Sequence, residues 1–275
     1  MKILRLIKRI NNKLHAESMN FIKSSLPAFF DSFFDNNVIK ELMNNNIEKP
    51  TKFKVSHWHL GYRYYTGIYN NKKVFIKINK KINWIKHEYE IFEYIKETSN
   101  NLYNRVPKIY KYVETSRYSY IIEEFVNYKR LKDTISTNKE VEKDKVYKEF
   151  IDIIKELHKI NLLHMDINDE NIYIDNNNNI YLTDFGFSLI SNNIQLDFIG
   201  DKKDKKYIFE NLNNVSRLEE GFIDDAISFL KISKDIDKNF YTKYHNFWKE
   251  ISKLSGIVYF DYNSYINNKE RKNIN

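Results

Sequence analysis

The sequence contains no cysteine, three prolines and six glycines in 275 residues. The absence of cysteine excludes disulfides, thiolate metal sites and a cysteine nucleophile, and it suits a reducing compartment. The six glycines form no G-x-G-x-x-G motif, which excludes a glycine-rich loop of that pattern. Asn, Lys, Ile, Tyr and Phe are abundant instead. An AT-rich genome produces this bias as readily as function does, so it favours no activity.

Composition and charge are ordinary for a globular protein. Hydrophobic residues make up 42% and charged residues 30% of the chain, which is long enough for one large domain or two lobes. The formal net charge is +8, but basic and acidic residues are interspersed and no basic recognition motif is present. We therefore expect a solvated mixed surface and no nucleic-acid partner. No histidine pair has the helical spacing of a zinc site.

The first 50 residues predict a helical extension. Residues 2–15 place five basic residues opposite an apolar stripe, and the segment is too short and too charged to span a bilayer. Two interpretations stay open: a helix docked on the domain, or a helix lying on an anionic membrane surface. Residues 26–34 carry a second apolar stripe and predict another helix. We expect a cytoplasmic protein with peripheral contact to the inner face of a membrane through residues 2–15.

Residues 51–126 predict a small β-rich lobe with one helix. Asn70-Asn71 stands between two strand-like runs, where a tight turn is needed. The apolar spacing then becomes helical and returns to strand-like runs. The expected elements are, in order, strands at residues 65–69 and 73–78, a helix at 83–96, and strands at 108–115 and 118–126.

Residues 127–275 predict a reduced helical lobe. Residues 141–160 carry the apolar stripe of a helix, and two short strands at 171–175 and 180–184 bracket an Asn-rich turn. Everything after residue 197 is expected to be mainly helical. The predicted fold is therefore α+β and bilobal, and a cleft between lobes is a common place for a ligand.

Four motifs carry the chemistry, each on an element suited to it. They contain cations for phosphate oxygens, carboxylate and amide ligands for Mg²⁺, and a carboxylate that can orient an acceptor hydroxyl, the groups that phosphoryl transfer needs. With these motifs the chain resembles the protein-kinase superfamily over roughly residues 55–230. The motifs are Val74-Phe75-Ile76-Lys77 on a strand, Glu88 on the next helix, His164-Met165-Asp166 with Asn171, and Asp184-Phe185-Gly186.

The resemblance implies an ATP- and Mg²⁺-dependent kinase. Lys77 would contact the α- and β-phosphates of ATP, held by an ion pair with Glu88. Asp166 would accept or orient the acceptor's proton. Asn171 and Asp184 would hold Mg²⁺. We prefer Glu88 to its neighbour Glu90 because the apolar residues of the helix then follow at i+3, i+4 and i+7.

Two further assignments follow from the resemblance. The segment from Glu124 through Phe125 to Val126 would bind adenine through its backbone groups, as the hinge between the lobes does in that family. His164 would brace the loop rather than act as an acid or base, and Phe185 would pack between the lobes.

The chain departs from the family pattern before the Lys77 strand. The nearest register of a glycine-rich loop places Gly61, Arg63 and Thr66 at its three positions. Without small residues the backbone cannot approach phosphates in the usual way. Either Arg63 or a tyrosine reaches the phosphates instead, or nucleotide binding is weak.

Two departures leave the acceptor open. Asn168 stands where protein serine/threonine kinases usually carry lysine, and no A-P-E motif follows Asp184. Within residues 224–230, DDAISFL, Asp225 would anchor the catalytic loop. These features resemble bacterial kinases of lipopolysaccharide-core sugars, so a sugar or glycolipid hydroxyl is the preferred acceptor and lipopolysaccharide biosynthesis the expected process.

Two alternatives remain. One is a compact serine/threonine protein kinase of viral or bacterial effector type, acting on a protein hydroxyl. The other is a pseudokinase that scaffolds partners, which the altered glycine loop favours. Against the scaffold, the four polar residues Lys77, Asp166, Asn171 and Asp184 are all present, and such a cluster is costly without a ligand.

Overall fold

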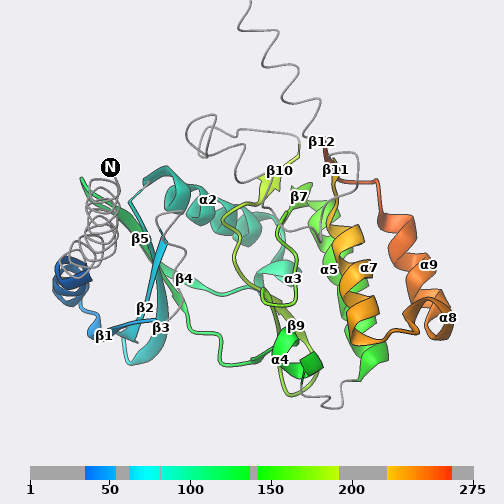
Figure 1. Ribbon diagram of the computed structural model, residues 1–275. Coiled ribbons are helices and arrows are strands. Elements are labelled where there is room, and N and C mark those ends of the chain that lie inside the picture. Colours follow the sequence, from blue (N-terminus) through cyan, green and yellow to red (C-terminus); the bar gives the residue numbers. More distant parts are fainter. Residues whose placement is uncertain (1–34, 54–61, 81, 137–141, 192–221, 262–275) are drawn as a thin grey trace, which may run out of the picture.

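The computed structural model describes residues 35–53, 62–80, 82–136, 142–191 and 222–261 (Figure 1). The helices predicted at residues 2–15 and 26–34, and Gly61, lie outside the described residues. In Figure 1 a β-sheet lobe stands beside a mostly helical lobe, and the chain passes between them after β5. The predicted α+β bilobal fold is confirmed.

A five-stranded antiparallel sheet forms the N-lobe, in the order β1-β2-β3-β5-β4. Asn70 and Asn71 have φ angles of 50° and 61°, the left-handed values that a two-residue type I′ turn requires and that asparagine tolerates. The predicted hairpin is confirmed, although its first strand begins three residues earlier than expected, at Tyr62. The strands are β1 (Glu48–Lys52), β2 (Tyr62–Tyr69), β3 (Lys72–Asn79), β4 (Ile109–Glu114) and β5 (Ser119–Glu124).

Both faces of this sheet are covered. A helix at residues 35–44 places Val38 and Leu42 in an apolar cluster with side chains of β2, β3 and β5. Helix α2 (Ile82–Thr98) packs on the opposite face through Trp84 and Ile85. The predicted boundary of the helical extension at residue 50 falls inside β1, so residues 35–50 are part of the N-lobe sheet and its packing.

The C-lobe is built around α5 (Lys143–Lys159), whose side chains Val146, Phe150, Ile153 and Leu157 lie in the largest apolar cluster. Helices α7 (Asp225–Ile236) and α9 (His245–Leu254) pack beside it (Figure 1). The remaining elements are α3 (Asn100–Tyr103), β6 (Lys129–Arg130), α4 (Leu131–Ser136), β7 (Leu162–Leu163), β8 (Ile172–Ile174), β9 (Ile180–Leu182), β10 (Leu189–Ile190), β11 (Phe222–Ile223), α8 (Phe240–Lys243) and β12 (Phe260–Asp261).

Short strand pairs place the loops of the C-lobe. β6, β8 and β9 form one small sheet, β7 pairs with β10, and β11 pairs with β12. The polar stretch after α5 therefore runs between β7 and β8, and the stretch after β9 runs to β10. Both loops are held at their two ends by strand pairing, which is how a scaffold fixes loop side chains against a ligand.

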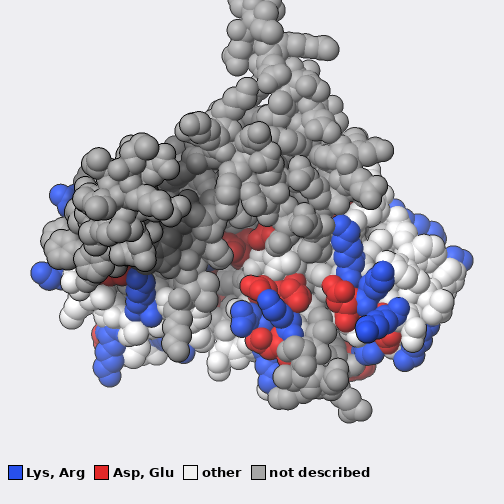
Figure 2. Space-filling view, viewed as in Figure 1, with Lys and Arg blue, Asp and Glu red and all other residues white. Residues whose placement is uncertain are grey.

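The described surface mixes charges of both signs. Figure 2 shows Lys and Arg side chains lying among Asp and Glu side chains on the face in view. Among the helices that the structure describes, none is long and apolar enough to cross a membrane.

Candidate active site

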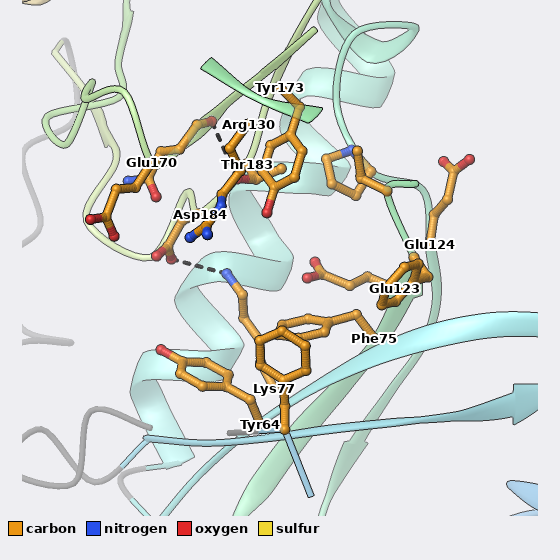
Figure 3. Close-up of a pocket in the computed structure, with 15 residues that line it drawn as sticks. Tyr64, Phe75, Lys77, Glu123, Glu124, Arg130, Glu170, Tyr173, Thr183 and Asp184 are labelled. Atoms are coloured by element: carbon orange, nitrogen blue, oxygen red, sulfur yellow. Dashed lines mark hydrogen bonds and ion pairs between the residues drawn. The ribbon is translucent and has the colours of Figure 1, made fainter. Parts of the chain in front are cut away.

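A buried lysine links the two lobes. Lys77 of β3 contacts Glu88 of α2, with Nζ 2.6 Å from Oε1, and Asp184 of the loop after β9, with Nζ 2.9 Å from Oδ1 (Figure 3). The Lys77 side chain is 5% exposed and that of Glu88 is 0% exposed, whereas that of Asp184 is 33% exposed. Burial alone would lower the pKa of Lys77, but Asp184 and Glu88 raise it well above its ordinary value. The ammonium is therefore held charged at the edge of the cavity.

In the catalytic loop predicted from sequence, hydrogen bonds from two asparagine side chains surround Asp166. Asn171 Nδ2 donates to Asp166 Oδ2 and to its backbone carbonyl, both at 2.9 Å. Asn168 Nδ2 donates to Asp166 Oδ1 at 3.2 Å, and Asn168 Oδ1 accepts from the backbone N–H groups of Glu170 and Asn171. Two amides therefore fix both oxygens of the carboxylate.

Asp225, at the start of α7, anchors this loop through hydrogen bonds to its backbone. Its Oδ2 accepts from the His164 N–H at 2.6 Å and its Oδ1 from the Met165 N–H at 3.0 Å. Met165 has a φ angle of 66°, a strained value for a non-glycine residue that needs such support. Burial raises the pKa of Asp225 to about 7, against the effect of the two N–H donors.

Asp224, the residue before Asp225, connects the start of α7 to residues 255 and 256 of the C-lobe. It caps α7 through the Ala226 N–H, and its Oδ2 accepts from Ser255 Oγ at 2.9 Å and from the Gly256 N–H at 2.7 Å. β11, which precedes Asp224, pairs with β12, which follows Gly256. The support of the catalytic loop therefore includes residues 255–261.

His164 and Phe185 pack together beneath the site. His164 is buried, its Nε2 lies 3.0 Å from the Thr183 carbonyl, and its ring centroid lies 4.5 Å from that of Phe185. Burial lowers the pKa of His164 to about 4, so the imidazole is neutral near pH 7 and suits a bracing role. Phe185 also contacts Phe92 of α2, with ring centroids 5.3 Å apart, which places it between the lobes.

A cavity of about 210 Å³ lies between the lobes beside Lys77. Its lining includes Asn171 and Asp184 of the C-lobe and the segment of Glu124, Phe125 and Val126. Aromatic side chains make up much of its remaining wall. They are Phe53, Tyr64, Phe75, Phe125 and Tyr173.

Comparison with known proteins identifies the family to which a chain with this site belongs. The model of the protein kinase domain matches residues 63–203, just over half of the chain. The chain belongs to the protein kinase family. Every site residue described above except Asp224, Asp225, Ala226, Ser255 and Gly256 lies within the matched span or is part of the cavity wall.

Similar proteins are kinases by name. The dual specificity protein kinase zakA of Dictyostelium discoideum is 30% identical over 146 residues, which is 51% of this chain and 17% of that protein. An Aurora kinase of Eremothecium gossypii is 40% identical over 88 residues, 30% of this chain and 24% of that protein. A probable serine/threonine-protein kinase KIN1 homolog of Enterocytozoon bieneusi is 36% identical over 84 residues. Each match therefore spans less than a quarter of the relative's own length.

Arg63 is not among the residues that line the cavity, contrary to the alternative in which its side chain reaches the phosphates. The register pairs Arg63 with Ile78 and Tyr64 with Lys77. Because side chains alternate along a strand, Tyr64 shares the cavity face with Lys77, and Arg63 faces the other side of the sheet. Arg63 is 4% exposed there, and its Nη1 donates to the Tyr62 carbonyl at 3.0 Å.

Tyr64 fits the alternative that a tyrosine reaches the phosphates. Figure 3 shows its hydroxyl on the same side of the cavity as Asp184 and Lys77. Burial raises the pKa of the Tyr64 phenol well above its usual value, and Asp184 raises it further. The hydroxyl therefore stays protonated and can donate a hydrogen bond.

The structure adds kinase-site residues that sequence patterns did not single out. Glu123, Arg130, Tyr173 and Thr183 line the cavity, as does Glu170, which forms an ion pair with Lys132. Strand alternation offers a signal for Glu123, which is two residues after the apolar Ile121 on the same face. Nothing local distinguishes the others.

The residues present fit Mg²⁺ as a companion of bound phosphates. Asn171 donates through Nδ2, which leaves its Oδ1 as the cation ligand, and Asp184 supplies carboxylate oxygens on the same wall. The described part of the chain contains no group of three or more His, Cys, Asp or Glu side chains that could hold a metal ion. Mg²⁺ takes one or two protein ligands and completes its shell with phosphate oxygens and water.

Glu123 predicts a pH dependence of stability. Burial raises its pKa from the ordinary 4.5 to about 8, against the effect of Lys77 and with that of Glu88. The folded chain thus keeps a proton that the unfolded chain loses between these values. Stability from this group is complete below about pH 4.5 and falls as the pH rises toward 8, by at most about 1.4 kcal/mol per pH unit.

Urea unfolding of the wild type and Glu123→Gln at pH 5, 6, 7 and 8 checks this. The free energy of unfolding of the wild type should fall relative to that of the variant as the pH rises, because all other titrating groups are shared. Parallel curves would show that Glu123 does not take up the proton. The exposed Glu97→Gln serves as the control, for which parallel curves are expected.

Proposed function

We propose that this chain transfers the γ-phosphate of ATP to a serine or threonine hydroxyl of a protein. The observation that carries the proposal is Lys77 held between Glu88 and Asp184 at a cavity that Asn171 also lines. Similar proteins that are named as serine/threonine or dual specificity protein kinases support the protein acceptor.

Each residue has a part in the proposed transfer. Lys77 neutralises the α- and β-phosphate oxygens, and backbone groups of Glu124 to Val126 bind the base. Asn171 and Asp184 would hold Mg²⁺, which would supply positive charge to the phosphate groups. The Asp166 carboxylate receives the proton of the attacking hydroxyl, and Asn168 and Asn171 keep it aimed through hydrogen bonds. Positioning and electrostatic stabilisation account for most of the catalysis in such transfers.

The expected preference for a lipopolysaccharide-core or other sugar hydroxyl gains no support from the comparisons, which match protein kinases. The structure also gives Asn168, a main reason for that preference, a different explanation. Its amide joins Asp166 to the N–H groups of Glu170 and Asn171, so it braces the loop. Asn168 therefore does not argue for a sugar acceptor, and the protein acceptor is the better proposal.

Contact of residues 2–15 with a membrane, and a cytoplasmic location, stay predictions. Deleting these residues should reduce binding of the chain to vesicles that contain anionic lipids, whereas unchanged partitioning would favour a docked helix.

Nucleotide binding is tested by thermal shift. Mg-ATP should raise the melting temperature of the wild type, because a ligand that binds only the folded state stabilises it by mass action. Lys77→Met should weaken ATP binding by at least about tenfold, since it removes a charge-assisted contact worth about 1.5–3 kcal/mol. Lys72→Met, an exposed change on the same strand, should behave as wild type. No stabilisation of the wild type at any Mg²⁺ concentration would favour a scaffold that does not bind nucleotide.

The acceptor is tested by offering radiolabelled ATP in parallel to a delipidated protein extract and a glycolipid fraction. Label is expected in the protein extract and should survive treatment with hydroxylamine, which cleaves acyl phosphates but not phosphoserine or phosphothreonine esters. Label confined to the glycolipid fraction would contradict the protein acceptor and return the sugar hydroxyl to first place.

A further inference from the structure

Asp184 has a backbone conformation that its surroundings must support. Its φ angle is 68°, in the left-handed region that residues other than glycine rarely adopt. The ion pair with Lys77 holds the carboxylate itself. Side chains of β2 and α2 contact the residues that follow Asp184 in the chain, and these contacts are with Gly186, Phe187 and Ser188.

Tyr62 of β2 occupies the space beside Gly186. A Cβ atom at Gly186 would lie 3.1 Å from the Tyr62 hydroxyl oxygen, which is shorter than an ordinary van der Waals contact of 3.4–4 Å. Gly186 does not have a positive φ angle, so its backbone conformation is open to residues with a side chain. The position excludes a side chain for another reason, because Tyr62 is 5% exposed and packs against other rings.

An aromatic row connects Tyr62 to the next residue of this segment. The Tyr62 ring stacks on that of Tyr64, with centroids 6.1 Å apart and planes inclined by 17°, and it meets Trp84 of α2 edge-on at 5.8 Å. Trp84 in turn meets Phe187 edge-on, with centroids 6.0 Å apart. Offset stacking and edge-to-face contact are the arrangements that aromatic pairs prefer. The row therefore packs β2 and α2 against the segment after Asp184.

One face of α2 carries several of these contacts together. Trp84, His87 and Glu88 stand at positions i, i+3 and i+4, which lie on the same side of a helix. Glu88 binds Lys77, and His87 Nε2 lies 2.8 Å from the Ser188 carbonyl oxygen. This face of α2 therefore fixes both the site lysine and the segment that follows β9.

We propose that Tyr62 and Trp84 are positioning residues for Asp184, which keep its carboxylate in place to bind Mg²⁺. The inference rests on the proposed function, since it assumes that Asp184 holds the metal beside bound ATP. The two rings act through Gly186 and Phe187, by opposing the departure of this segment from its strained conformation. Without them Asp184 occupies its binding position in a smaller fraction of molecules, and the apparent affinity of the site falls by that fraction.

A purely structural role for the two rings gives a different expectation. Rings that serve only as core packing contribute to the free energy of unfolding, and their loss leaves each folded molecule with an intact site. The quantity that separates the two roles is the Mg²⁺ gain, defined as the Kd of ATP in EDTA divided by the Kd of ATP in Mg²⁺. A positioning role predicts that this gain falls, because only the complex with Mg²⁺ depends on where Asp184 lies.

Calorimetry measures the Mg²⁺ gain for the full chain as wild type, Tyr62→Ala, Tyr62→Phe, Trp84→Ala and Tyr69→Ala. Tyr62→Ala and Trp84→Ala should lower the gain by about 3- to 10-fold, because each removes at least one aromatic pair. Tyr62→Phe keeps the ring and should keep the wild-type gain. Tyr69→Ala is the control for lost packing, since Tyr69 ends the same strand and packs on the apolar cluster of the other sheet face. Its Mg²⁺ gain should equal that of the wild type even where its stability is lower.

Gly186→Ala tests the contact itself. The added methyl group would meet the Tyr62 hydroxyl oxygen and displace the segment, so the Mg²⁺ gain should fall as it does in Tyr62→Ala. The double variant Gly186→Ala with Tyr62→Phe lacks that oxygen, and its gain should recover toward the wild-type value. Hydrogen exchange supplies a readout without nucleotide. The Ser188 N–H, which donates to the Phe185 carbonyl at 3.0 Å, should exchange faster in Gly186→Ala and Tyr62→Ala than in the wild type.

An unchanged Mg²⁺ gain in Tyr62→Ala, or a double variant no better than Gly186→Ala, would overturn the inference and leave the kinase proposal standing. ATP binding to the wild type that Mg²⁺ does not strengthen would also overturn it. If the wild type binds no ATP under either condition, the proposed function fails together with the inference. Circular dichroism establishes that the variants are folded. Should Tyr62→Ala not fold, the comparison of Gly186→Ala with the double variant decides.

Discussion

Replacing Asp166 with alanine should lower the rate of phosphate transfer by about 10²- to 10⁴-fold, the usual contribution of a positioned acid or base. The carboxylate is fixed at both oxygens by Asn168 and Asn171, so the loop presents it in one orientation. Asp166 is not among the residues that line the cavity. The variant should therefore bind Mg-ATP with nearly wild-type affinity.

Single-turnover transfer and an ATP thermal shift, measured on the same preparation, separate these two effects. Asp169→Ala, three positions along the same loop, is the matched control and should keep most of the transfer rate. Transfer at the wild-type rate in Asp166→Ala would show that another group receives the proton. A matching loss of ATP binding would show instead that the substitution collapses the loop.

The second large effect is expected for Asp225→Ala, which should lower the free energy of unfolding by about 2–4 kcal/mol. The change removes the acceptor of two buried N–H groups, those of His164 and Met165, and each unsatisfied donor costs about 1–3 kcal/mol. Relief from burying the carboxyl, whose pKa burial raises to about 7, offsets part of this loss. The strained Met165 backbone should then relax, and transfer should fall with it.

Urea unfolding measures the change in the free energy of unfolding, and the transfer assay measures the change in the rate of phosphate transfer. Asp235→Ala changes an exposed carboxylate on the same helix and should leave both quantities within error of the wild type. An Asp225→Ala variant with wild-type stability and activity would contradict the anchoring role assigned to this residue.

Local sequence patterns predicted the elements whose conformation depends on neighbouring residues. The Asn70-Asn71 hairpin, the helix that carries Glu88 and the loop that carries Asp166 each follow from periodicity or turn chemistry within about 20 residues of sequence. The preference for Glu88 over Glu90 also depended on helix periodicity alone. The structure places Glu88 against Lys77, whereas Glu90 is 60% exposed and lies 4.0 Å from Lys86.

Features that depend on register and distant contacts were not predictable in this way. Arg63 was one of two alternatives for contact with the phosphates because it occupies a position of the nearest glycine-loop register, and the pairing of β2 with β3 places Tyr64 on the face of Lys77 instead. A shift of one residue exchanges the two faces of a strand. Asn168 looked like a clue to the substrate, but its hydrogen bonds show it bracing the loop. Asp225 was expected to anchor the catalytic loop only because of the family resemblance, since it meets His164 across 61 positions of sequence, which no window of local pattern includes.

The link from Asp224 to Ser255 and Gly256 has a consequence for how the protein is made. The N-lobe sheet uses residues before 125 and can form early during synthesis, since domains and lobes fold as their residues emerge from the ribosome. The support beneath Asp166 cannot, because β11 requires β12 as its partner and Asp224 requires residues 255 and 256. The nascent chain therefore has the N-lobe wall of the cavity, with Tyr64, Phe75 and Lys77, well before it has a fully supported catalytic loop, which is complete only once residues 255–261 are in place.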